Sequence, residues 1–148
     1  MSFFAKLRRA TPPASEDIPR AVMTPAVAAI MADGEMQQEE VTQLSNLCAF
    51  SPVFAHIEPK RLADMVRELI AEIMDTGGDT VLREASLKLS PELRETAFCF
   101  VVRVVMADGT VEAREKDALS RIADILQLEA GAVADIYRVI AMLQRPAH

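Results

Sequence analysis

A short motif occurs twice in the chain, and this repeat constrains the fold more than any other sequence feature. Residues 31–34 read Met-Ala-Asp-Gly, and the same four letters recur at residues 106–109. Three further pairs keep the same spacing: Glu40 and Glu115, Leu44 and Leu119, and Ser45 and Ser120. An internal repeat of this length predicts two copies of one supersecondary unit.

Each copy of the motif lies between two segments with helical character. Apolar residues 24–31 and 93–106 precede the two copies with little polar relief on any face, so we expect them to be buried central helices. An amphipathic helix is expected after each copy, because apolar residues recur there near the helical period. These residues are Val41, Leu44, Leu47 and Cys48 in the first copy and Leu119, Ile122, Ala123 and Leu126 in the second.

Further helices are expected between and after the two copies. Residues 62–74 follow the i, i+3, i+4, i+7 pattern until Gly77-Gly78 ends them, and a shorter helix is expected at residues 79–89. Ser90-Pro91 supplies an N-cap and a first-position proline for the second central helix. A last helix follows a short connection at residues 128–131. Its inward residues are Val133, Ile136, Tyr137 and Ile140.

No segment alternates as a strand would, so the sequence predicts an all-α protein. We expect a single-domain bundle of about seven helices, built on two pseudo-symmetric helix-loop-helix repeats. A length of 148 residues suits one compact domain with one core. Residues 1–16 are predicted to be an N-terminal arm and residues 17–148 the helical domain. The prolines in Thr11–Ser15 are expected to keep that part of the arm extended.

The location of the protein is expected to be cytoplasmic. The first residues lack the apolar region and cleavage site of a signal peptide. The longest apolar stretch, residues 97–107, contains Arg103 and is shorter than the roughly 20 residues that cross a bilayer. Phe3, Phe4 and Leu7 lie beside three cations, so this segment has two interpretations: peripheral contact with an anionic membrane, or a frayed or packed terminus.

The charge of the chain is concentrated at the repeated motifs. Its net charge is -6, with a pI near 4.9. Residues 33–40 hold four acids and no base, and residues 108–117 hold four acids against two bases, so the remaining acids and bases cancel. An acidic chain does not suit nucleic acid, because phosphate binding needs a basic stripe. A cation or a basic protein segment is the favoured partner.

Two interpretations of the acidic motifs stay open. In the first, Asp33 or Asp108 caps a helix, and Glu39, Glu40 and Glu115 lie in a first turn that favours anions. In the second, each motif is half of a cation site, because an Asp-Gly pair followed by a Glu six residues after the Gly matches the second half of an EF-hand loop. The first and third ligand positions of that loop fall on apolar helical residues. These are Ala29 and Met31 in one copy and Val104 and Met106 in the other.

One loop alone therefore cannot enclose calcium, but two facing half-sites would pool their carboxylates. The predicted metal-binding set is Asp33, Glu40, Asp108 and Glu115, with Glu35, Glu39 and Glu112 nearby. Oxygen ligands favour calcium or magnesium over zinc, and the same carboxylates would suit a Lys or Arg from a partner. No Cys or His lies at ligand spacing, and Cys48 and Cys99 are predicted to be buried thiols.

These features resemble the TerB family, which is associated with bacterial tellurite resistance. The likeness runs from residues 1–4 to the final helix and is strongest in the two Ala-Asp-Gly loops and their glutamates. The resemblance implies an all-helical bundle with an acidic, metal-binding surface that acts with other tellurite-resistance or stress-response proteins, some of them at the inner membrane. Gln37 and Gln38 replace carboxylates that are common in the family, which weakens the first half-site.

Three functions compete at this point. The first is a metal-dependent interaction or sensing module, and the second is a metal-independent adaptor whose acidic face docks a basic segment. The third is an enzyme, either a metal-assisted hydrolase or a tellurite reductase. We expect no enzyme, because the carboxylates are accompanied by no histidine, nucleophile or phosphate-binding loop, and no exposed thiol pair is apparent.

Overall fold

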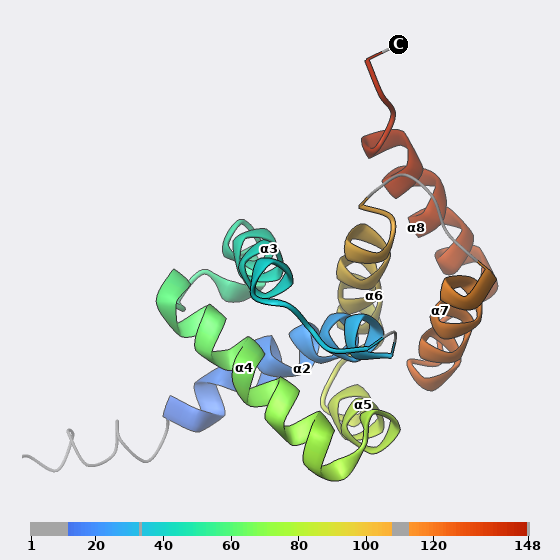
Figure 1. The fold of residues 1–148 in the computed structure, drawn as a ribbon. Helices are drawn as coiled ribbons and strands as arrows, with labels where there is room; N and C mark the ends of the chain where they lie inside the picture. Colours follow the sequence, from blue (N-terminus) through green and yellow to red (C-terminus); the bar gives the residue numbers. More distant parts are fainter. Residues whose placement is uncertain (1–11, 33, 108–112, 148) are drawn as a thin grey trace, which may run out of the picture.

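The computed structural model describes residues 12–32, 34–107 and 113–147, and these residues form helices joined by short connections (Figure 1). The helices are α2 (Pro12–Met31), α3 (Gln38–Ala49), α4 (Pro59–Thr76), α5 (Gly78–Leu87), α6 (Pro91–Val105), α7 (Ala113–Ile125) and α8 (Ala130–Leu143), with a short 3-10 helix at Pro52–Phe54. No strand occurs in these ranges, so the all-α prediction is confirmed. The pseudo-symmetry of the two repeats stays a prediction.

The two helices predicted to be central are central. α2 and α6 pack against each other more extensively than any other pair of helices. α3 and α4 lie on one side of this pair, and α7 and α8 lie on the other (Figure 1). Val22, Met23 and Val27 of α2 are fully buried, as are Phe98 and Val101 of α6. A continuous apolar core therefore runs through the middle of the domain.

Helix ends follow the predicted local signals. The Ser90 side chain accepts a hydrogen bond from the backbone N–H of Leu93 at 3.2 Å, and Pro91 opens α6. Gly77 separates α4 from α5 with a φ of 102°, a conformation that favours glycine. The predicted N-cap and the predicted glycine stop are both confirmed.

The extended conformation predicted for the arm is wrong from Pro12 onward, because α2 begins at Pro12. A proline in the first turn of a helix loses no hydrogen bond, since the first amides have no partner within the helix. Pro19 and Pro25 also lie inside α2, where the helix continues in spite of them. The domain boundary after residue 16 stays a prediction.

The connection before the last helix is shorter than predicted. α8 begins at Ala130 with Glu129 as its N-cap, so Ala130 and Gly131 belong to the helix rather than to the connection. α7 ends in a tight turn, in which the N–H of Leu128 donates to the carbonyl of Ala123 at 3.1 Å. Gln127 in this turn has a φ of 57°, which is the left-handed region.

Candidate functional site

The start of α3 holds the glutamate of the first repeat in place. Gln37 is the N-cap of α3, and Glu40 is the third residue of the helix. The backbone N–H of Gln37 donates to Oε1 of Glu40 at 2.9 Å, as in a capping box. The capping interpretation is therefore right about Glu39 and Glu40, which lie in the first turn, and wrong about Asp33 as the N-cap of this helix.

The start of α7 holds the corresponding glutamate of the second repeat. α7 begins at Ala113, so Glu115 is also the third residue of its helix. Glu40 and Glu115, which correspond in the two repeats, thus occupy the same place in their helices. The Glu115 side chain is partly buried.

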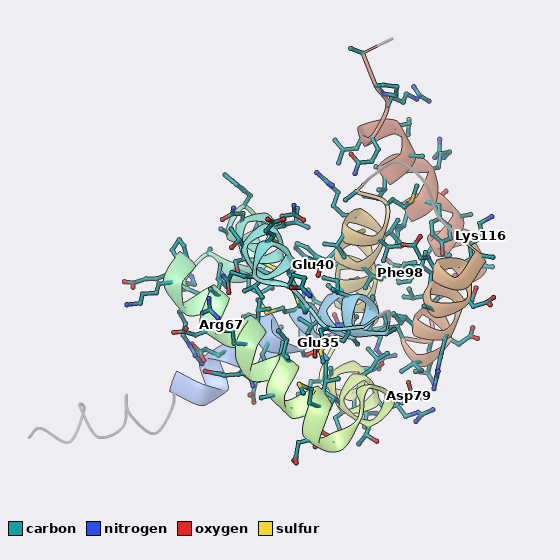
Figure 2. All side chains as sticks on the ribbon, viewed as in Figure 1. Glu35, Glu40, Arg67, Asp79, Phe98 and Lys116 are labelled. Carbon is teal, nitrogen blue, oxygen red and sulfur yellow. The ribbon has the colours of Figure 1, made fainter. Side chains whose placement is uncertain are left out.

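Both glutamates line the same cavity. This acidic pocket has a volume of about 260 Å³ and lies where the end of α2, the end of α6 and the starts of α3 and α7 come together. Glu35, Glu40 and Glu115 supply its carboxylates. The rest of its lining is apolar and comprises Ala29, Ile30, Ala32, Val104, Val105, Ala118 and Leu119. Figure 2 labels Glu35 and Glu40 near the centre of the molecule, close to α2.

The predicted metal-binding set is only partly visible in this pocket. Asp33, Asp108 and Glu112 lie outside the described residues. Glu39 is exposed and is not part of the lining. Within the described ranges, no three His, Cys, Asp or Glu side chains are close enough together to hold a metal ion. Glu35, Glu40 and Glu115 thus share a pocket without forming a complete ligand shell by themselves.

The first and third ligand positions of the two EF-hand-like loops are helical as predicted, except Met106, which is the C-cap of α6. Ala29 and Met31 belong to α2, and Val104 belongs to α6. Ala29 is buried, and Met31 and Val104 pack against the core. These positions supply no oxygen from their side chains, so a cation in the pocket would depend on carboxylates from both repeats.

A second cavity that sequence reasoning missed adjoins the acidic pocket. It has a volume of about 590 Å³ and shares Ala32 and Ala118 with the acidic pocket. Apolar side chains supply much of its lining, from Ala28, Met31, Ile73, Met74, Leu82, Ile122 and Ile125. Asp79 and Arg121, which form an ion pair, also line it. Four helices contribute these residues, so no local pattern in the sequence predicts this cavity.

The two thiols both have a raised pKa. Cys48 is fully buried, and burial raises the pKa of its thiol to about 12. Cys99 is only half-buried, so the prediction of a buried thiol holds for Cys48 and is too strong for Cys99. Burial and then the nearby charge of Glu95 raise the pKa of Cys99. Both thiols therefore stay protonated at neutral pH.

An ion-pair network joins Glu16 and Arg20 in the N-terminal half of α2 to α4, away from the acidic pocket. Arg61 donates to Glu16 at 2.7 Å and to Glu68 at 2.6 Å, and Arg20 donates to Glu68 at 2.8 Å. Hydrogen bonds from Arg61 lower the pKa of both glutamates. This network holds the part of α2 around Glu16 against α4.

A comparison with known protein families agrees with this architecture. The family model described as "Tellurite resistance protein TerB" matches residues 19–138, which run from the first turns of α2 into α8. No curated protein and no solved structure matches the chain. In the ranges that the structure describes, no helix is long and apolar enough to cross a membrane. With its match over most of the chain and its all-helical fold, this chain belongs to the TerB family of tellurite-resistance proteins.

Proposed function

We propose that this TerB-family protein is an interaction or sensing module that binds a divalent cation at the acidic pocket. The observation that carries the proposal is that Glu40 and Glu115, which correspond in the two repeats, line one cavity. Carboxylates that share a small, partly apolar cavity repel each other, and a bound cation removes this repulsion. The motif residues Asp33 and Asp108 are close in sequence to these glutamates and complete the proposed ligand set.

The proposed ion is calcium or magnesium rather than zinc. All proposed ligands are carboxylate oxygens, which hard cations prefer, and no histidine or cysteine lines the pocket. Binding would draw the starts of α3 and α7 toward one ion. A cation would thereby couple the two repeats and change the acidic surface that a partner meets.

Isothermal titration of metal-stripped protein with calcium, magnesium and zinc tests this proposal. We expect calcium or magnesium to bind the wild type, and the double variant Asp33→Ala/Asp108→Ala to lose binding. Glu40→Gln keeps an oxygen that can accept the Gln37 amide but removes the charge, so it should weaken binding without loss of the helix cap. Glu39→Gln is the matched control, because Glu39 is exposed outside the pocket lining. Unchanged titrations for the double variant would overturn the proposal.

A second candidate is an adaptor that docks a basic partner segment without a metal. It is favoured by the cap on Glu40, which engages one carboxylate oxygen, and by the lack of a preformed ligand cluster in the described ranges. A partner complex that survives chelator and dissociates in high salt would favour this adaptor. A complex that needs the cation would favour the first candidate.

The proposed setting is the cytoplasm, beside other tellurite-resistance or stress-response proteins, some of them at the inner membrane. We propose no enzymatic role. The raised thiol pKa values of Cys48 and Cys99 oppose thiol-based reduction of an oxyanion, because the thiolate is the reactive form. Turnover of tellurite by the purified protein would contradict this assignment.

A further inference from the structure

The acidic pocket and the apolar cavity lie side by side, because Ala32 and Ala118 line both. We call the two together the docking groove. Met74 lies in its apolar half with 74% of its surface exposed, although it is a large apolar side chain. An exposed methionine beside an apolar floor is typical of a surface that binds another apolar group.

The two halves of the docking groove favour different side chains. Glu35 and Glu40 line one half with carboxylates, and Glu115 lines the same half. In the other half, Asp79 and Arg121 pair with each other, which leaves the lining there mainly apolar and electrically balanced. A fitting occupant therefore carries cations close to large apolar side chains and has no acid of its own.

The chain contains a segment of this chemistry. Residues 3–9 read Phe-Phe-Ala-Lys-Leu-Arg-Arg, with three cations, three large apolar side chains and no acid. These residues lie outside the described ranges. We propose that residues 3–9 of one copy dock in the docking groove of a second copy, with the cations at the acidic half and the apolar side chains at the other.

The segment cannot place its two arginines in the acidic half of the groove of its own copy. The groove lies against the C-terminal end of α2, at Ala28 and Ala32, whereas residues 3–9 are joined to the opposite end, at Pro12. The helix from Pro12 to Ala28 spans about 24 Å at 1.5 Å per residue. Even when fully extended, the backbone from Arg8 to Pro12 covers at most about 14 Å, and Arg9 is nearer still to Pro12. Docking of the whole segment therefore requires a second copy.

This geometry predicts self-association of the protein. Two copies that exchange segments form a closed dimer, and one-way docking forms an open chain of copies. The inference uses the acidic pocket of the proposed function but needs no metal. The two ideas are separable, because self-association is measured in chelator and cation binding is measured by titration.

Sedimentation velocity over a wide range of protein concentrations, in EDTA, tests the proposal. We expect the average mass of the full-length protein to rise with concentration. Met74→Lys and Phe3→Ser/Phe4→Ser should each weaken association about tenfold or more. Leu87→Lys is the matched control, because Leu87 is 82% exposed but does not line the groove. It should associate like the wild type.

A charge exchange tests docking between copies. Arg8→Glu/Arg9→Glu gives a copy with an acidic segment and an acidic groove, and Glu35→Lys gives a copy with a basic segment and a weakened acidic groove. Each variant alone should associate more weakly than the wild type. An equal mixture of the two should recover association, because the basic segment of the Glu35→Lys copy then meets the unchanged acidic groove of the other copy. Glu35 is exposed, so its substitution should leave the fold intact.

Three results would overturn the proposal. The first is a wild-type protein that stays monomeric at every concentration. The second is association that responds to Met74→Lys but not to substitutions in residues 3–9, which would assign the groove to another surface. The third is a monomer that floats with phosphatidylglycerol vesicles and loses flotation on Phe3→Ser/Phe4→Ser, which would make the segment a membrane contact.

Discussion

Glu40 has two roles at the scale of a single residue, and substitutions separate them. Its carboxylate accepts the N–H of Gln37 and also lines the acidic pocket. Glu40→Ala removes the acceptor and should lower the free energy of unfolding by about 1 kcal/mol, the usual loss for a helix cap. Glu40→Gln retains an acceptor and should lose less. Urea denaturation of both variants checks this, and equal losses would show that the charge, rather than the hydrogen bond, stabilises α3.

Gln127 offers a second prediction at this scale. Its φ of 57° places a residue with a Cβ in a conformation that glycine adopts without strain. Gln127→Gly should raise the free energy of unfolding by about 1 kcal/mol. The substitution also removes the 3.3 Å hydrogen bond from Arg94, which is exposed and contributes little. Gln127→Ala removes that bond but keeps the strain, so it should not stabilise. Thermal denaturation that ranks alanine above glycine would contradict this account.

At the scale of the elements, the stability that the contact between α2 and α4 contributes should depend on pH. Hydrogen bonds from Arg61 lower the pKa of Glu16 and Glu68 in the folded state. A lowered carboxyl pKa gives stability that is present above the unfolded value, near 4.5, and is lost as pH falls through the folded value. Glu16→Gln should therefore cost about 1 kcal/mol or less at pH 7, since the pair is partly exposed. At low pH, where Glu16 is protonated, urea titrations should show little difference between the variant and the wild type.

The elements also show what the sequence could predict. Periodicity and local signals predicted α4, the glycine stop at Gly77 and the cap at Ser90, because these depend on neighbouring residues. The start of α2 was not predicted correctly. Prolines in the first turn are compatible with a helix, and the pairing of Glu16 with Arg61 holds that turn on α4. This contact joins residues far apart in sequence, which a local pattern does not reveal.

At the scale of the whole molecule, stability should depend mainly on the helices around α6. Phe98 of α6 is fully buried and packs edge to face against Tyr137 of α8 at a centroid distance of 6.0 Å. Phe98→Ala should lower the free energy of unfolding by about 3 to 5 kcal/mol, because a large cavity replaces the ring. Phe50→Ala is the matched control and should change it little, since Phe50 is 90% exposed. Comparable losses for the two variants in urea denaturation would contradict the assigned core.

The candidate site was predictable only in part, because the tertiary fold brings residues from separate helices together. The repeat and the charge distribution indicated Glu40 and Glu115, and both line the acidic pocket. The apolar half of the docking groove was not predicted, because Ile73, Met74, Ile122 and Ile125 come from two different helices. Each of these side chains fits a helical apolar pattern, and the sequence does not say which of them stay uncovered.

The packing of α2 on α6 has a consequence for how the protein folds during its synthesis. α2 ends at Met31 and α6 begins at Pro91, so the largest contact of the fold joins the first described helix to one from the second half of the chain. Contacts between distant segments form late, because a long loop must close first. During synthesis, the apolar face of α2 stays uncovered until α6 has left the ribosome. The nascent chain in that interval is the form of this protein most in need of a chaperone.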